Sequence, residues 1–257
     1  REFYHAHTVR YDECNCYGYL TPASFLRYMQ DIAALDAENV QLSGYGHWVV
    51  KKTVIAFTAP IPAHTRLELK TYGIAFTHAT AQRGYEAYIA DEQHDEPTIS
   101  AHTLWVYVDS RGRPMRLPAG TAQIWLPDGS LSQQTETPFP AFPEDAPRTT
   151  TSVVRFSDID PMQHLNNASA VEMLDNAAWE VYAKDKIMPP AARIDALYYD
   201  IEYVDSPRFG ETLEVQSWFL PFPSVGKAFG RFQQIAREGK VTTRAYSRWI
   251  WTVNSDL

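Results

Sequence analysis

The sequence has little cysteine and no long apolar run. Among its 257 residues, the only cysteines are Cys14 and Cys16. A zinc site needs about four ligands, and two cysteines this close are a poor disulfide framework, so we expect two reduced, half-buried side chains. A catalytic cysteine is the alternative. No stretch approaches the ~18 apolar residues of a membrane helix, and residues 1–5 lack the apolar core of a signal peptide, so we expect a cytoplasmic protein without membrane insertion.

Positive charge is also scarce. The chain carries 23 Lys and Arg against 31 Asp and Glu, a formal net charge of −8. Nucleic-acid binders normally present a basic face, so we expect no nucleic-acid partner. Aromatic residues are plentiful, with 15 Tyr, 12 Phe and 7 Trp. Because these residues favour strands, the composition indicates a β-rich fold.

The two halves of the chain repeat one pattern. Residues 9–15 align with residues 154–160 at an offset of 145 (154 minus 9), and the match continues into the segments that follow. Residues 67–71 likewise resemble 213–217, and 101–105 resemble 245–249. Three blocks in the same order indicate a duplicated domain. We therefore expect an N-terminal domain over 1–132, a proline-rich extended linker over 133–149 and a C-terminal domain over 150–257.

Each half is expected to contain one long helix followed by four long strands. Apolar residues three and four positions apart predict helices over 22–41 and 167–184, each preceded by a short strand over 4–13 or 150–158. The later strands are expected over 47–59, 65–79, 82–91 and 97–109, and over 193–205, 211–221, 226–237 and 240–253. The fold class is therefore α+β, with antiparallel sheets.

The loop before the second helix contains the side chains best suited to chemistry. Asp160 can act as a general base on water or as a nucleophile, and His164 can orient that water, polarise a carbonyl or shuttle a proton. Asn166 and Asn167 stand where the helix begins, where free backbone N–H groups can hold an oxyanion. Structural interpretations remain open: Asp160 as a turn former before Pro161, His164 as a structural histidine, and the two asparagines as cap and loop-fixing residues.

This loop resembles the D-x-x-x-H-x-N-N signature of hotdog thioesterases. Together with the duplication, and with Trp48, Lys51, Lys52 and residues 105–109, it makes the chain resemble the acyl-ACP thioesterases of bacteria and plant plastids over nearly its whole length. The resemblance implies a tandem (double) hotdog, in which each half is a long helix wrapped by an antiparallel sheet. It also implies an acyl carrier protein as partner and four catalytic residues: Asp160, His164, Asn166 and Asn167. Nothing in the sequence requires a metal or organic cofactor.

The sequence departs from the plant members of that family. Met162 stands where they have Asn, although many single-domain hotdog thioesterases resemble D-x-M-x-H at this place. Ser206 and Pro207 stand where the plant proteins have Glu and Cys, which excludes a cysteine nucleophile in this half. Glu202 and Asp205 are the candidates to substitute for the missing Glu.

The first half has lost the chemical groups of the loop, because Asn15 replaces Asp160 and Tyr19 replaces His164. We expect this half to supply the scaffold and an apolar acyl pocket. Ordinary core packing is the alternative for the three helix residues among the candidates. The candidate substrate-binding residues are Asn15, Tyr19, Phe25, Met29, Ile32 and Met162.

The leading hypothesis is hydrolysis of fatty acyl-ACP to free fatty acid and holo-ACP. The alternatives are an acyl-CoA thioesterase, a non-hydrolytic protein that binds acyl thioesters, and a hydratase or dehydratase. ACP is acidic, so its enzyme should carry a local basic patch despite the net charge. Its candidates, all in the first half, are Lys51, Lys52, Arg83, Arg111, Arg113 and Arg116, with scattered solvated charges as the alternative. We expect a monomer or a homodimer.

Overall fold

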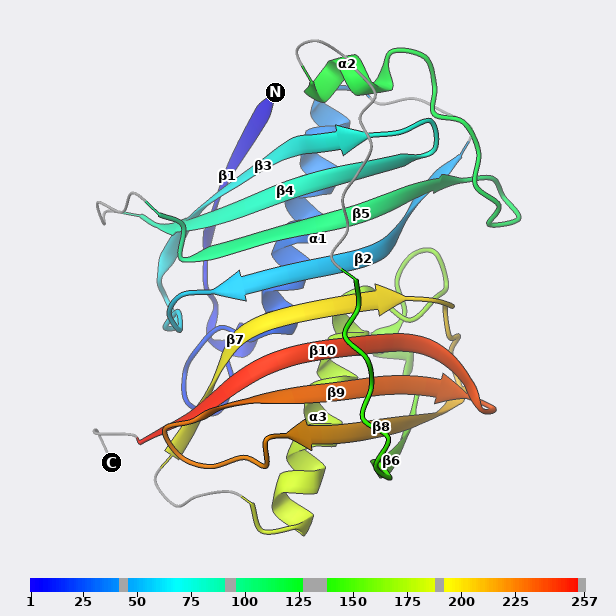
Figure 1. Ribbon diagram of the computed structural model, residues 1–257. Helices are drawn as coiled ribbons and strands as arrows, with labels where there is room; N and C mark the ends of the chain where they lie inside the picture. The colour runs from blue at the N-terminus through cyan, green and yellow to red at the C-terminus, as the bar shows by residue number, and fades with distance from the viewer. Residues whose placement is uncertain (42–45, 91–95, 127–137, 188–191, 254–257) are drawn as a thin grey trace. The chain divides into compact units, whose positions relative to one another are not determined.

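The chain forms two compact units, Arg1–Pro138 (unit 1) and Phe139–Leu257 (unit 2) (Figure 1). The computed structural model describes residues 1–41, 46–90, 96–126, 138–187 and 192–253. Of the predicted linker over 133–149, residues 133–137 lie outside the described residues. Residues 138–147 form neither helix nor strand, and the first strand of unit 2 begins at Arg148.

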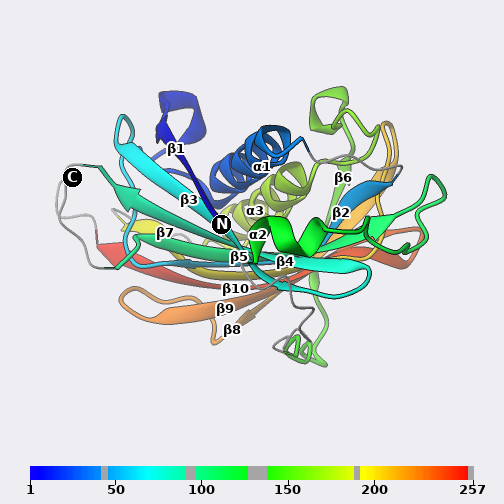
Figure 2. The ribbon, with the colours of Figure 1, turned by 90° about the horizontal axis from the view of Figure 1, so that it is seen from above.

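Unit 1 is a helix packed on one face of a five-stranded antiparallel sheet (Figure 2). The sheet has the order β1-β3-β4-β5-β2. Its elements are β1 (Glu2–Thr8), the 3-10 turn η1 (Tyr11–Glu13), α1 (Pro22–Asn39), β2 (His47–Phe57), β3 (Arg66–Phe76), β4 (Thr80–Ile89), β5 (Ile99–Val108) and the short helix α2 (Thr121–Trp125).

Unit 2 repeats this arrangement, with the sheet order β7-β10-β9-β8-β6. Its elements are β6 (Arg148–Val153), the 3-10 turn η2 (Phe156–Asp158), α3 (Asn167–Lys184), β7 (Ala192–Tyr203), β8 (Thr212–Leu220), β9 (Ala228–Arg237) and β10 (Lys240–Val253). Each unit is thus one long helix against a curved antiparallel sheet. The predicted fold class, a double hotdog, is confirmed.

Both long helices begin at a capping side chain that the sequence supplies. The Thr21 hydroxyl accepts a hydrogen bond from the Ser24 backbone N–H at 3.1 Å, and Pro22 occupies the first helical position. The Asn166 side chain accepts from the Ala168 N–H at 2.9 Å. Caps at the same place fix both helices at a common offset of 145 residues, so positions along α1 and α3 can be compared one by one.

The structure corrects two expectations about local structure. The strands expected over 4–13 and 150–158 end at Thr8 and Val153, because the chain turns back on itself. Glu13 accepts from the Arg10 backbone N–H at 2.7 Å, and Asp158 accepts from that of Arg155 at 2.8 Å, so each carboxylate closes a 3-10 turn. Helix α2 was not expected at all. Among the described helices, none is both long and apolar enough to cross a membrane.

Candidate functional site

The loop between η2 and α3 is a tight turn organised by Asp160. Its Oδ1 atom accepts hydrogen bonds from the backbone N–H groups of Met162 at 2.9 Å and His164 at 3.3 Å. Its own N–H donates to the His164 carbonyl at 2.9 Å. Within the described residues, no hydrogen bond engages Oδ2. One carboxylate oxygen therefore fixes the turn while the other is available to water or substrate.

Unit 1 makes the same turn without a charge. The Asn15 Oδ1 atom accepts from the N–H groups of Tyr17 at 3.0 Å and Tyr19 at 3.1 Å, and the Asn15 N–H donates to the Tyr19 carbonyl at 2.8 Å. An amide oxygen is thus sufficient to hold this turn. Holding the turn therefore explains why residue 160 has an acceptor oxygen, but it does not explain why that residue carries a negative charge.

The turn in unit 2 also holds a strained residue. Gln163 has φ +67°, whereas the corresponding residue in unit 1 is Gly18 with φ +82°. A left-handed conformation costs a residue with a side chain about 1–2 kcal/mol, and glycine avoids that cost. Strain of this kind is often found at functional sites, which motivates the hypothesis that the loop of unit 2 is one.

The remaining predicted catalytic residues lie on the same loop and the first turn of α3. His164 is half-buried, and Met162 is exposed. Asn166 is the N-cap of α3, and the Asn167 carbonyl lies 3.4 Å from the hydroxyl oxygen of Tyr203. The capping interpretation of Asn166 therefore holds in the structure. The reactive roles of His164, Asn166 and Asn167 stay predictions.

Asp158, two residues before Asp160, has a structural role. Its side chain is 6% exposed and forms an ion pair with the Arg155 guanidinium, with a shortest distance of 2.8 Å. It also accepts from the Arg155 backbone N–H. Both oxygens are therefore occupied in stabilising the turn before the loop.

The predicted substrate-binding residues of unit 1 fall in two places. Asn15 organises its turn, and Tyr19 lies half-buried beside it. Phe25, Met29 and Ile32 are buried on the face of α1 that packs on the sheet, around a void of about 10 Å³. That space is no more than one water molecule needs. Core packing explains these three residues, and their contact with a substrate stays a prediction.

A larger pocket opens one turn further along α1. It is half-enclosed, has a volume of about 240 Å³ and is lined mainly by small and aromatic residues. The small residues are Ala33, Ala34, Ala37, Gly73 and Ala81, and the aromatic residues are Trp48, Phe76, Trp105 and Trp125. Apolar walls with a few polar groups are typical of small-molecule sites. Unit 1 therefore contains an apolar pocket next to the residues predicted to line one.

Unit 2 has large side chains at the equivalent positions of its own core. The helix offset of 145 makes Tyr182 the counterpart of Ala37. In the sheets, Arg83 and Arg231 are equivalent residues. The residue paired with Arg83 is Gly73 and the residue paired with Arg231 is Phe219, so Phe219 corresponds to Gly73.

The same register argument makes Phe229 the counterpart of Ala81, since these residues pair with Trp249 and Trp105, respectively. The Tyr182 ring packs on the rings of Phe219 and Phe229, with centroids 5.3 Å and 6.5 Å apart. Aromatic rings thus fill in unit 2 the space that stays open in unit 1.

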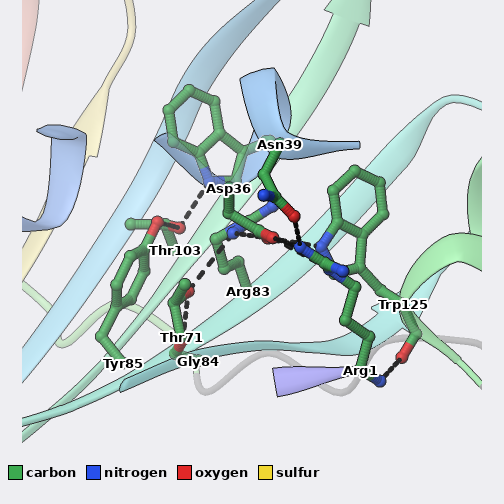
Figure 3. Close-up of polar contacts among 10 residues, drawn as sticks. Arg1, Asp36, Asn39, Thr71, Arg83, Gly84, Tyr85, Thr103 and Trp125 are labelled. Atoms are coloured by element: carbon green, nitrogen blue, oxygen red, sulfur yellow. Dashed lines mark hydrogen bonds and ion pairs between the residues drawn. The ribbon is translucent and has the colours of Figure 1, made fainter. Parts of the chain in front are cut away.

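A buried ionic cluster adjoins the pocket (Figure 3). The fully buried carboxylate of Asp36 accepts from Trp125 Nε1 at 2.6 Å, from Arg83 Nη1 at 2.8 Å and from Arg1 Nε at 3.1 Å. Burial alone raises the pKa of Asp36, but the hydrogen bonds from Trp125 and Arg83 and the charge of Arg83 outweigh it. The pKa of Asp36 is therefore lowered, and the carboxylate is ionised at neutral pH.

Sequence reasoning missed the residues that make this pocket. Ala37, Gly73 and Ala81 look unremarkable alone, and Trp125 lies outside the repeated blocks. The signal that could have found them is a residue-by-residue comparison of the two halves. That comparison aligns Ala37, Gly73 and Ala81 of the first half with Tyr182, Phe219 and Phe229 of the second.

The expected basic patch is smaller than the sequence suggested. Arg83 and Lys52 are largely buried, Arg83 against Asp36, so they cannot form part of a surface patch. Lys51, Arg111, Arg113 and Arg116 are exposed, although Arg113 is paired with Asp109 at 2.9 Å. The described residues contain no cluster of three or more His, Cys, Asp or Glu side chains arranged to hold a metal ion.

Residues 1–119 match the family described as the acyl-ACP thioesterase N-terminal domain. The first 119 residues, just under half of the chain, are thus similar to the acyl-ACP thioesterase family. This match agrees with the family predicted from the loop and the repeat, which is a family of thioester hydrolases. Among curated proteins, none matches the sequence.

Three solved structures share the fold over nearly the full chain. A putative oleoyl thioesterase from Lactobacillus plantarum is 18% identical with a TM-score of 0.83, and the match covers 97% of this chain and 96% of that one. The 12:0-ACP thioesterase from Umbellularia californica is 15% identical with a TM-score of 0.78, covering 97% and 94%. An acyl-ACP thioesterase from Bacteroides thetaiotaomicron is 15% identical with a TM-score of 0.72, covering 96% and 97%. At these identities the likeness concerns the fold.

Proposed function

We propose that this protein hydrolyses a fatty acyl thioester of acyl carrier protein, releasing free fatty acid and holo-ACP. The observation that carries the proposal is the apolar pocket of unit 1, which exists because three core positions are small where unit 2 has aromatic rings. A packed core ordinarily leaves few voids larger than a water molecule. A pocket this size suits an apolar ligand such as an acyl chain.

The chemistry belongs to the loop of unit 2. In this proposal the free Oδ2 atom of Asp160 either removes a proton from water that attacks the thioester carbonyl, or attacks that carbon itself. In the second case the thiolate leaves as the acyl–aspartate anhydride forms, and water then cleaves the anhydride to release the fatty acid. His164 orients the water or passes the proton to the departing thiolate. N–H groups at the start of α3 face the charge that develops on the carbonyl oxygen, although the Asn166 side chain occupies that of Ala168.

The acyl chain gains binding free energy from the pocket. Each methylene group removed from water contributes about 0.8 kcal/mol, so even half of a fatty chain supplies several kcal/mol. The carrier supplies a second set of contacts, for which the exposed Lys51, Arg111 and Arg116 are the candidates. An acidic carrier would be attracted to these charges, and the attraction would weaken with added salt.

The test follows thiol release from matched series of acyl-ACP and acyl-CoA thioesters. We expect turnover with acyl-ACP, at a kcat/KM that falls as salt rises. The variant Ala37→Tyr, which introduces the residue found at this place in unit 2, should reduce kcat/KM for long acyl groups at least ~10-fold while sparing short ones. Ala37→Ser, which keeps the residue small, is the matched control.

Other outcomes would redirect the proposal. Faster turnover of acyl-CoA than of acyl-ACP would make the protein an acyl-CoA thioesterase. Tight binding of acyl thioesters without any thiol release would show a non-hydrolytic binding protein. Equal effects of Ala37→Tyr on all chain lengths would show that the pocket does not hold the acyl chain.

A further inference from the structure

The pocket of unit 1 has an open side and a closed side. Ala34 is exposed and Ala37 is half-buried, so the pocket opens along α1. Trp125, from helix α2, is only 3% exposed and forms part of the closed wall. An acyl chain that enters from the open side must stop where a fixed side chain blocks it.

Trp125 is fixed by contacts on three sides. Its Nε1 atom donates to Asp36 Oδ2 at 2.6 Å, its ring stacks on Phe76 with centroids 5.9 Å apart, and the Arg83 guanidinium lies 5.0 Å from its centroid. In Figure 3, Asp36 and Arg83 lie beside the Trp125 ring. A side chain held by a hydrogen bond, a stack and a cation cannot swing aside without losing all three.

The backbone of β3 is adapted to this tryptophan. A Cβ atom at Gly73 would lie 2.7 Å from the Cβ atom of Trp125, closer than two carbon atoms can approach. Glycine at position 73 is therefore what allows α2 to approach the sheet and Trp125 to reach the pocket. Gly73, Asp36 and Arg83 therefore all help to hold the Trp125 ring in this position.

The size of the pocket then sets a limit on its ligand. The half-enclosed volume of about 240 Å³ is many times the ~10–15 Å³ that a single water molecule needs, so it has room for several methylene groups in a row. We propose that Trp125, as the fixed closed wall of the pocket, is the residue that limits the length of the acyl chain. This inference rests on the proposed function, because it takes the pocket to be the acyl site.

The test compares chain-length profiles of wild type and Trp125→Leu. Binding of straight-chain fatty acids, in steps of two carbons, is measured by titration calorimetry, and hydrolysis of the acyl-ACP series is measured in parallel. The profile of Trp125→Leu should move to longer chains by at least one step. Each methylene that gains burial should strengthen binding about fourfold, so the acid one step beyond the wild-type optimum should bind about 15-fold more tightly.

Two further variants protect the test against misfolding. Trp125→His keeps an N–H donor for Asp36 while removing the larger part of the ring, and should shift the profile in the same direction. Trp218→Leu is the matched control, because Trp218 is also buried and donates from Nε1, to the Asp145 carbonyl at 2.5 Å, but lies in unit 2. It should leave the chain-length optimum unchanged.

The outcomes separate the two proposals. An unchanged optimum in a folded Trp125→Leu or Trp125→His variant, or the same shift in Trp218→Leu, would overturn the role of Trp125. Absence of hydrolysis of every thioester by the wild type would overturn the proposed function instead. The fatty-acid binding profile would still decide whether Trp125 limits the pocket.

Discussion

Replacing Asp160 by Asn separates the charge of this residue from its role in the turn. Asn15 shows that an amide oxygen holds the same turn in unit 1, with hydrogen bonds of 3.0 Å and 3.1 Å against 2.9 Å and 3.3 Å for Asp160. The variant should therefore keep the loop conformation. It removes the negative charge that a general base or nucleophile needs.

The two interpretations differ in the size of the effect on activity. Charge-assisted hydrogen bonds are about twice as strong as neutral ones, so weakening two of them should lower the free energy of unfolding by about 1 kcal/mol. For a chain of this size that corresponds to a fall of about 2–4 °C in Tm. Loss of a positioned acid or base lowers the rate about 100-fold to 10,000-fold. If Asp160 only held the turn, a variant that stays folded would not lose activity on that scale.

The assay is thiol release from acyl-ACP, with Tm measured on the same preparations. Asp12→Asn is the control, because it removes one carboxylate from an exposed turn of unit 1 and should change kcat less than twofold. If Asp160→Asn retained more than about a tenth of the wild-type rate, the claim that the negative charge of Asp160 serves catalysis would be wrong. A fall in Tm of more than about 10 °C would show that the turn does need the charge.

Two further predictions concern stability. Gln163→Gly should relieve the left-handed strain of about 1–2 kcal/mol against a glycine entropy cost of about 0.5–1 kcal/mol, and so raise Tm by about 1–3 °C, whereas Gly18→Ala should lower it. Asp36→Asn should lower the free energy of unfolding by about 3 kcal/mol at pH 7, because it breaks a buried ion pair. Since the pKa of Asp36 is lowered in the folded state, its contribution exists above its unfolded pKa of about 3.9 and disappears as pH falls through the lower folded value. Urea titrations should show the gap between wild type and variant narrowing below about pH 4, and a constant gap would contradict this reasoning.

Much of the fold follows from pattern alone. Helix α3 begins and ends at the predicted residues, and β10 spans the predicted range, because period and caps are local properties of the sequence. The first strand of each unit was predicted too long, since the carboxylates of Glu13 and Asp158 bond back to the chain and close a turn. Helix α2 is only five residues long, too short for a periodic signal, and its position depends on Asp36 and Phe76 far away in sequence.

The candidate site divides in the same way. The loop around Asp160 and His164 could be predicted because all of its residues are adjacent in the chain. The pocket could not be predicted, because the small residues that leave it open are far apart in the sequence and form no motif. Phe25, Met29 and Ile32 were the natural choice from helical spacing, yet the open space lies beside Ala34 and Ala37 one turn later.

The two units differ in the space that they leave open and not in the presence of a buried ion pair. Arg83 pairs with Asp36 in unit 1, and its counterpart Arg231 pairs with Asp175 in unit 2, where Val181 stands at the position of Asp36. Buried ion pairs are weak evidence for stability, and unit 2 combines its pair with aromatic rings that fill the core. Unit 1 instead has small residues at positions 37, 73 and 81 and uses a buried carboxylate to hold one tryptophan. A core that leaves this space open, where the same fold can fill it, is what we expect of a ligand site, so the choice of acyl chain should depend on unit 1 and the hydrolysis on unit 2.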